Sequence, residues 1–310
     1  MPYTPIVMRV IRVMKPFESP FYAPVHLARE LGHFADENLD VTVSAAPVTG
    51  GTVDALLRGS VEIALGGVMR SLELADRGGP FLPHFAEVNS RNGFFLLGRQ
   101  ARPGFSWKDL VGKTVIGFAE APTPWQCMLT VLRRHGVDPG TVMIERTLPV
   151  ADAVAAFTSG RGDFLETGQP ATEELVDAGA AHVLASMGEA TGPVPFSSFM
   201  TTPQFLESER DAVRRFTRAV YRTQTWIAAH PPAEIATPLG RVFADIPLAR
   251  LTRIVDRYRR QGTWASEPRL GRSGFETLQQ ILLDGGFIKH RHRYEDLVSV
   301  DIAEDAMRMS

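Results

Sequence analysis

The chain has 310 residues, enough for two compact domains, because single hydrophobic cores seldom grow beyond about 250 to 300 residues. Its 33 Lys and Arg residues nearly balance 35 Asp and Glu residues, and the formal net charge of −2 excludes a bulk attraction to nucleic acid or to an anionic membrane. Hydrophobic residues make up 44%, and no stretch reaches the roughly 18 apolar residues that would span a bilayer, so no transmembrane segment is expected.

The sequence has few signals for a compartment, a metal or a cofactor. Cys127 is the single cysteine, which excludes an intrachain disulfide and a site with several thiolate ligands. Residues 1–17 contain no continuous apolar run, so they predict no export signal. No GxSxG elbow, HExxH helix or paired-cysteine motif occurs, and we expect neither a metal nor a cofactor.

The first third of the chain alternates strands with helices. Residues 7–15 are rich in β-branched and apolar residues and predict a strand, and 24–34 has the apolar spacing of a helix, with Pro24 in its first turn and Gly32 at its end. The alternation continues with a strand at 39–44, a helix at 53–57, a strand at 61–65 and a helix at 69–75. This pattern predicts a mostly parallel sheet, whose ligands bind beyond the carboxyl ends of the strands.

A second copy of the same plan follows a strand at 94–98 and a polar connection at 102–112. Its strands are expected at 115–118, 143–147, 162–165 and 183–186, and its helices at 125–135 and 150–158. Long amphipathic segments at 207–229, 247–261 and 273–285 then indicate a helical return to the first half.

These elements predict an α/β protein with two lobes. Lobe 1 is expected to comprise 1–97 and 191–310, and lobe 2 to comprise 98–190. Two crossings, near 95–100 and 188–198, would then form a hinge between the lobes.

Several segments, taken in order, resemble a known family. They are PFYAPVHLARELGHFADENLDVTVS, TGGTVDALLRGSVEIALGG, DLVGKTVIGF, HGVDPGTV, VADAVAAFTSGRGDFLETGQPATEEL and VPFSSFMTTPQFL. Together they cover about 7–230 and resemble the periplasmic-type substrate-binding proteins of ABC transporters for nitrate, taurine, aliphatic sulfonates and thiamine pyrimidine precursors. The resemblance implies a type II periplasmic-binding-protein-like fold with a cleft between the lobes.

The resemblance also implies which chemistry is absent. Fungal pyrimidine-precursor synthases of this fold carry a cysteine-rich motif that this sequence lacks. Desulfinases of this fold have a cysteine where this sequence has Ser19 and an arginine where it has Ala64. The exported members carry a signal peptide or lipoprotein cysteine, so both a periplasmic and a cytoplasmic location stay open.

Four groups of residues are candidates for the cleft, at 17–22, 49–52, 121–125 and 166–170. The resemblance and the position of each group after a strand place them there. The predicted ligand-binding residues are Glu18, Ser19, Phe21, Tyr22, Thr49, Gly50, Gly51, Thr52, Gly67, Thr123, Trp125, Glu166 and Gln169. The turn 49–52 precedes a helix whose free N–H groups can meet an anionic or carbonyl group. Trp125 offers a flat apolar face, and Glu166 follows a short strand.

Each group also has a structural alternative. The turn 49–52 is equally typical of an ordinary helix cap, Thr123 can be a cap, and Trp125 and the Phe residues after the first strand can be core. Glu166 can belong to a surface loop. Cys127 is expected to be a small buried hydrophobe rather than a nucleophile.

The function expected from these observations is capture of a small organic ligand, with a permease of an ABC importer as partner and a monomeric state. The alternatives are an enzyme on the same fold, a lyase or hydrolase acting on a small aromatic acid with Glu18, Ser19 and Glu166 as acid–base groups, and a ligand sensor. An amine-bearing heterocycle such as a pyrimidine precursor is preferred over a sulfonate, carboxylate or nitrate, because the four groups contain carboxylates and no arginine.

Overall fold

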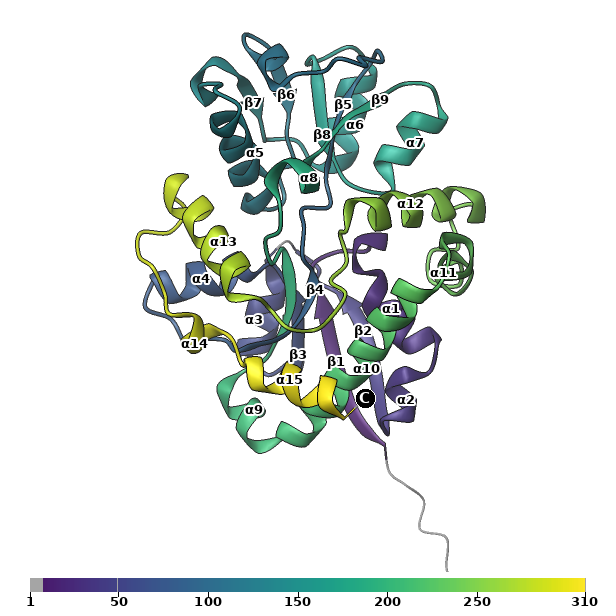
Figure 1. Ribbon diagram of the computed structural model, residues 1–310, viewed down its shortest axis with the longest axis vertical. Helices are drawn as coiled ribbons and strands as arrows, with labels where there is room; N and C mark the ends of the chain where they lie inside the picture. Colours follow the sequence, from purple (N-terminus) through teal and green to yellow (C-terminus); the bar gives the residue numbers. More distant parts are fainter. Residues whose placement is uncertain (1–7, 49, 310) are drawn as a thin grey trace, which may run out of the picture.

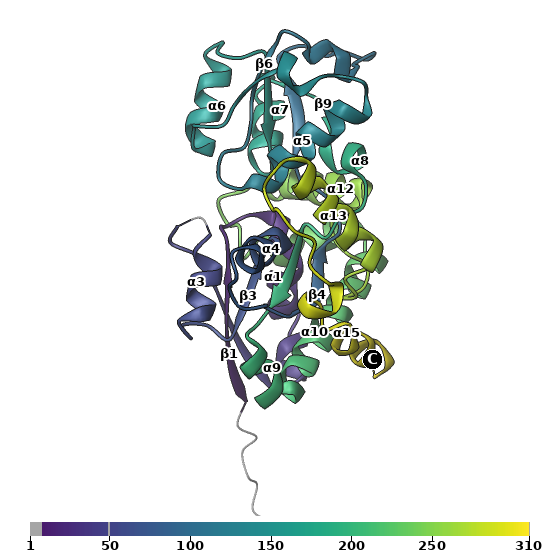
Figure 2. The same cartoon turned by 90° about the vertical axis from the view of Figure 1, so that its left-hand side faces the viewer.

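The computed structural model describes residues 8–48 and 50–309. Its strands form two five-stranded sheets with the same plan, and the sheets and their helices make up two lobes (Figures 1 and 2). The α/β, two-lobed architecture predicted from the sequence is therefore confirmed.

The first sheet has the order β2-β1-β3-β10-β4. Its strands are β1 (Arg9–Lys15), β2 (Leu39–Ala45), β3 (Ile63–Gly66), β4 (His84–Asn89) and β10 (Ser197–Met200). β1 pairs in parallel with β2 and β3, whereas β10 is antiparallel to β3 and β4. Because β10 alone is reversed, the sheet is mostly parallel.

The second sheet repeats this arrangement with the order β7-β6-β8-β5-β9. Its strands are β5 (Phe95–Gly98), β6 (Thr114–Ile116), β7 (Met143–Glu145), β8 (Phe164–Thr167) and β9 (His182–Ser186). Here β5 is the reversed strand, antiparallel to β8 and β9. In each sheet, therefore, the reversed strand is the first strand that follows a crossing of the chain from the other lobe.

Helices flank both sheets. The lower lobe of Figure 1 has α1 (Ala23–Glu30), α2 (His33–Asp36), α3 (Gly51–Leu57), α4 (Val68–Asp76) and the turn η1 (Pro20–Tyr22). The upper lobe has α5 (Pro122–Arg134), α6 (Val150–Thr158), α7 (Ala171–Asp177), α8 (Met187–Thr191), η2 (Trp107–Leu110) and η3 (Pro139–Thr141). The helix expected at 24–34 is split, because Gly32 adopts φ +79° between α1 and α2.

The remaining helices come from the C-terminal third. They are α9 (Pro203–Ser208), α10 (Arg210–Ala229), α11 (Pro232–Leu239), α12 (Leu248–Gln261), α13 (Arg272–Asp284), α14 (Tyr294–Leu297) and α15 (Val300–Arg308). α10 packs against α1, α2 and α15, with Phe216 stacked on Phe34 at 4.8 Å between ring centroids. α12 lies against η1 and α7, and α13 lies against α4 and α5, so both helices contact elements of each lobe.

Two strands lack the sequence pattern that identified the others. β4 is buried throughout but includes His84, Glu87 and Asn89, which interrupt its apolar run. β10 (SSFM) is also fully buried and begins with two serines. The expected lobe boundary after residue 97 falls inside β5, and the chain changes sheets between Asn89 and Phe95.

Candidate functional site

A cleft between the two sheets contains two adjoining cavities, which we call the Arg70 cavity and the Gln169 cavity after one residue of each. Their volumes are about 60 Å³ and about 240 Å³, respectively. Residues that line both cavities are Phe17, Phe21, Phe94, Phe118 and Glu120. The two cavities are therefore neighbouring parts of one elongated cleft.

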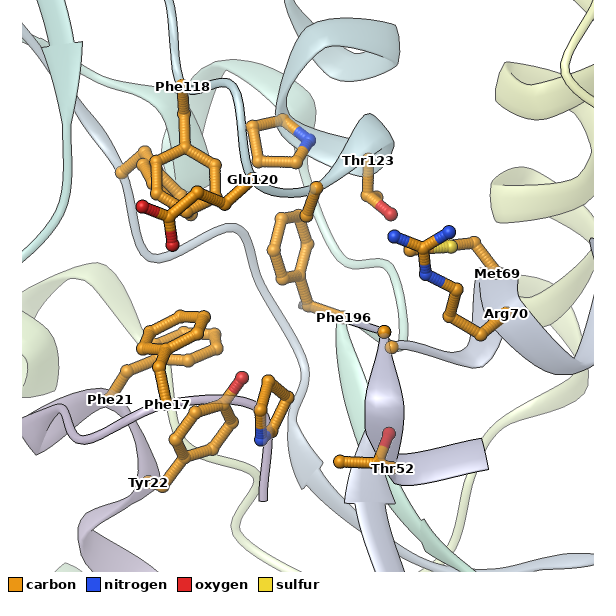
Figure 3. A pocket seen from close by; sticks show the side chains of 16 residues that line it. Phe17, Phe21, Tyr22, Thr52, Met69, Arg70, Phe118, Glu120, Thr123 and Phe196 are labelled. Atoms are coloured by element: carbon orange, nitrogen blue, oxygen red, sulfur yellow. The ribbon is translucent and has the colours of Figure 1, made fainter. Parts of the chain in front are cut away.

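Aromatic rings from both lobes form the shared wall. Phe17 follows β1 and Phe118 follows β6, the equivalent strand of the other sheet, and their ring centroids are 6.3 Å apart. Phe118 also contacts Phe94 at 4.6 Å, and Phe17 contacts Tyr22 at 5.4 Å. Figure 3 shows Phe17, Phe21 and Tyr22 facing Phe118 across the cleft. Tilted aromatic faces of this kind suit a flat apolar ligand.

Arg70 brings a guanidinium to the smaller cavity. It lies in the first turn of α4, just beyond the carboxyl end of β3, and its Nη1 donates to Glu73 Oε2 at 3.2 Å. Among the described residues, its Nε and Nη2 have no hydrogen-bond partner. The guanidinium lies beside Gly50, where a Cβ would stand 3.7 Å from Arg70 Cζ, and Gly50 itself adopts φ +82°. This cavity thus holds free cationic donors.

Two helix N-termini open into the same cavity. Gly67 is the N-cap of α4, and Thr123 lies in the first turn of α5; both line the cavity. Neither helix has a side-chain cap, so the positive end of each helix dipole is available to an anion. α4 offers the N–H groups of Val68 and Met69, whereas α5 offers that of Thr123, because Pro122 and Pro124 have no N–H. Figure 3 shows the Thr123 hydroxyl and the Arg70 guanidinium facing the same space.

Neutral polar groups line the larger cavity. Ser19 Oγ donates to the carbonyl oxygen of Gln169 at 3.0 Å, and the Gln169 N–H donates to Tyr258 Oη at 3.4 Å. The Ser19 bond joins residues from opposite lobes, 150 positions apart in sequence. The Gln169 backbone is therefore held from two sides.

Glu18 lines the larger cavity and is more exposed than Glu120, the other carboxylate there. It pairs with the buried Lys15 ammonium, and its Oε2 lies 3.8 Å from His26 Nε2. Burial lowers the pKa of Lys15, an effect that Glu18 opposes, and burial lowers the pKa of His26 to about 4. His26 is therefore neutral at pH 7.

Nine of the predicted ligand-binding residues line the cavities. They are Glu18, Ser19, Phe21, Tyr22, Gly50, Thr52, Gly67, Thr123 and Gln169. Thr49 lies outside the described residues. Thr123 lies inside α5 rather than at its cap, which is Ala121.

Three predicted residues lie outside both cavities, each for a geometric reason. Trp125 is two positions after Thr123 on α5, and this spacing turns its ring to another side of the helix, under the Arg146 guanidinium at 4.0 Å. Glu166 precedes Thr167 on β8, so its side chain is on the opposite face from the cavity-lining Thr167. Gly51 is buried, and a Cβ at this position would contact Val48 and Ala46 rather than a cavity.

The carboxyl of Glu166 is buried, and burial raises its pKa to about 7, although the Phe118 N–H and the charge of Arg146 oppose the rise. Cys127 is fully buried and outside the cavities, and burial raises the pKa of its thiol to about 12. No group of three or more His, Cys, Asp and Glu side chains within 8–48 and 50–309 is arranged to hold a metal ion.

Sequence reasoning missed several lining residues. Arg70 follows the Gly66-Gly67 end of a predicted strand, and that position was the available signal. Tyr258 belongs to the amphipathic segment 247–261, whose periodicity predicts only a buried helix face, and its place in the cleft depends on α12 reaching across from the C-terminal third. The four predicted groups contain no arginine, but Arg70, which lies outside them, lines the cleft, so the expectation of a cleft with carboxylates and no arginine is wrong.

Known proteins resemble this chain in sequence and in fold. The pattern of the NMT1/THI5-like family matches residues 19–234. YtlA from Bacillus subtilis (strain 168), which is named as a binding protein, is 30% identical over 297 residues, with 95% of this chain and 89% of YtlA covered.

Solved structures superpose over nearly the whole chain. The alkanesulfonate-binding protein SsuA from Xanthomonas axonopodis pv. citri, bound to MOPS, has a TM-score of 0.73 at 19% identity, with 93% of this chain and 97% of SsuA covered. The periplasmic nitrate-binding protein NrtA from Synechocystis PCC 6803 has a TM-score of 0.70 at 17% identity, with 97% and 89% covered.

Within the described part of the chain, no helix combines the length and the apolar character that crossing a membrane requires. The match to residues 19–234 spans most of the chain, and the YtlA alignment extends over nearly all of it. The chain therefore belongs to the NMT1/THI5-like family and has the two-lobed periplasmic-binding-protein fold that its sequence predicted.

Proposed function

We propose that this chain is a solute-binding protein that closes around a small, flat organic ligand with a compact anionic group. The observation that carries the proposal is a cleft with aromatic walls from both lobes and the free guanidinium donors of Arg70 at one end. A ligand that contacts both lobes favours the closed state, because only that state makes both sets of contacts.

The anionic group follows from the electrostatics of the Arg70 cavity. Arg70 is a planar multi-donor cation, and the α4 and α5 N-termini add positive dipole ends beside it. The small volume favours a compact group such as a sulfonate or carboxylate. With Arg70 present, the preference for a heterocycle without an anionic group loses its basis.

A heteroaromatic ring remains compatible with the shared wall. Glu120 lines both cavities, and one of its carboxylate oxygens accepts a long bond of 3.5 Å from the Val150 N–H. It is therefore free to accept a further hydrogen bond from a ring N–H or amino group.

The three residues considered as acid–base catalysts, Glu18, Ser19 and Glu166, are either paired with other protein groups or outside the cavities, which favours binding over catalysis. Glu18 pairs with Lys15, the Ser19 hydroxyl donates to the Gln169 carbonyl oxygen, and Glu166 lies outside the cavities. YtlA and the two solved neighbours are also named as binding proteins. We propose that the closed complex delivers its ligand to the permease of an ABC importer.

Calorimetric titration with benzenesulfonate, benzoate and 4-aminopyrimidine tests the ligand class. We expect the two anions to bind and Arg70→Gln to weaken them roughly 10- to 100-fold, as expected for the loss of a charged hydrogen-bonding group. The matched control is Arg77→Gln, because Arg77 is the C-cap residue of the same helix and also pairs with Glu73 but does not line either cavity.

The two variants remove the same charge, so the comparison isolates the position of the guanidinium. Equal losses in Arg70→Gln and Arg77→Gln would contradict an Arg70 contact. Binding of 4-aminopyrimidine alone, with no response to either anion, would contradict the proposed ligand class.

A further inference from the structure

The Gln169 side chain presents an unused donor beside the larger cavity. Gln169 is 95% buried and lines the cavity, and its Oε1 accepts the N–H of Glu173 at 3.2 Å. That bond identifies the oxygen of the amide, and therefore also its nitrogen. Among the described residues, Nε2 is a buried donor without a hydrogen-bond partner.

The position of this amide is fixed in the closed state. Its backbone carbonyl accepts from Ser19 of the facing lobe, and its backbone N–H donates to Tyr258. α7 begins two residues later, and its Glu173 holds the side-chain oxygen. A donor held at three points loses little conformational entropy when it meets an acceptor.

A buried donor without a partner is costly, and native structures supply one in most cases. The protein groups around Gln169 are already engaged, since Ser19 and Tyr258 bind its backbone and Thr172 Oγ1 donates to Gly168 O at 3.0 Å. No described protein acceptor, including the Glu120 carboxylate of the same cavity, lies within hydrogen-bond distance of Nε2, which leaves the contents of the cavity to supply the acceptor.

We propose that the Gln169 cavity is a second subsite, in which Nε2 of Gln169 donates a hydrogen bond to a neutral acceptor on the ligand, such as a carbonyl oxygen or a ring nitrogen. This inference rests on the proposed function and specifies the ligand further. The ligand is a bifunctional aromatic molecule with its anion at Arg70, its ring against the wall that Phe17 and Phe118 form, and its acceptor at Gln169.

The relative sizes of the cavities agree with this orientation. The Arg70 cavity, at about 60 Å³, holds a compact charged group, and the Gln169 cavity, at about 240 Å³, holds the larger neutral part. A neutral acceptor is favoured over a second anion because the Glu18 and Glu120 carboxylates line the same cavity.

Calorimetry with a matched pair of probes tests the subsite. In 4-acetylbenzenesulfonate a carbonyl stands opposite the sulfonate, and in 4-isopropylbenzenesulfonate a branched alkyl group of similar size replaces it. We expect the parent protein to bind the acetyl probe roughly three- to tenfold more tightly than the isopropyl probe, which is the range for one neutral hydrogen bond.

Two substitutions remove the donor in different ways. Gln169→Met deletes the amide, and Gln169→Glu keeps an oxygen for the Glu173 N–H while replacing Nε2 with an acceptor. Both should abolish the preference for the acetyl probe, and Gln169→Glu should reverse it. Gln224→Met, which removes a buried amide of α10 outside the cavities, is the matched control and should leave the preference unchanged.

The outcomes separate the subsite from the function. If both probes bind with dependence on Arg70 but with equal affinity, the subsite is overturned and the proposed function stands. If neither probe binds the parent protein, the proposed function fails and the subsite fails with it. Should Gln169→Met lose stability, Gln169→Glu still decides the question, because it retains the bond to Glu173.

Discussion

Glu166 and Thr167 are neighbours on β8, but their side chains lie on opposite faces of the sheet. The next residue, Thr167, lines the Gln169 cavity, whereas the Glu166 carboxyl lies on the other face of the sheet with one oxygen unpartnered. Burial is the main reason that its pKa rises to about 7. The same residue that was expected to bind ligand is therefore a determinant of how stability depends on pH.

The pKa of Glu166 is about 7 in the folded protein and 4.5 ordinarily, so the folded state binds more protons than the unfolded chain between these values. The free energy of unfolding then falls as the pH rises through this window. Between pH 5 and pH 8 the parent should lose about 2 to 3 kcal/mol more than Glu166→Gln, in which this group cannot titrate.

Urea denaturation of both proteins at the two pH values measures this difference. The comparison with the variant is needed because burial also raises the pKa of Glu87, to about 8, and that contribution is common to both proteins. An identical pH dependence in the two proteins would show that Glu166 titrates normally.

At the scale of elements, α12 and α7 are joined by a cluster of ion pairs. Arg253 and Arg257 reach the buried Glu173 at 3.4 and 2.5 Å, and Arg250 and Arg253 reach Asp177 at 2.7 and 2.5 Å. α12 also lies against η1 of the first lobe, and α7 belongs to the second. The Arg253 and Arg257 side chains thus connect the lobes beside the Gln169 cavity.

Glu173→Gln should lower the free energy of unfolding by about 2 kcal/mol, because it leaves two guanidinium groups without a buried carboxylate. Asp177→Asn is the matched control on the same helix; its carboxylate is more exposed, so the loss should stay below about 1 kcal/mol. Denaturation in 0.05 and 0.5 M NaCl measures both, and salt should reduce the effect of Asp177→Asn more. Equal losses in the two variants would contradict this account.

At the scale of the molecule, both lobes converge on the crossing at 90–94. Gly93 lines the Gln169 cavity, and a Cβ at this position would stand 2.4 Å from the Phe21 ring. Gln261 of α12 donates to the carbonyl oxygen of Asn92 and accepts from Ser186 at the end of β9. A Cβ on Gly188 would stand 2.5 Å from the same carbonyl oxygen, so the two crossings and α12 meet at one place. We propose that the lobes divide here and move about these segments.

Gly93→Ala should weaken ligand binding roughly tenfold, because the added methyl displaces the Phe21 ring into the cleft. Gly104→Ala is the control, since a Cβ there would meet no atom within 4 Å. Calorimetry with benzenesulfonate gives the affinities, and thermal denaturation reports the folding of each variant. Unchanged affinity in a folded Gly93→Ala protein would place the ligand away from Phe21.

Local sequence was sufficient for the repeated strand–helix plan, the two-lobed fold and most of the turns that follow the parallel strands. Apolar periodicity and glycine positions act over a few residues, and the carboxyl ends of parallel strands meet at one edge of a sheet. Nine of the predicted site residues line the cavities for that reason.

Only the tertiary structure decided which face of each element meets the cleft and what lies opposite. Trp125 and Glu166 are in the expected segments but turn away from the cavities, whereas Arg70 and Tyr258 enter them from helices that had no assigned role. Tyr258 meets residues near position 20 because α12 packs across η1 and α7. Periodicity identifies a buried face but carries no information about which distant segment covers it, and the cleft consists of such long-range contacts.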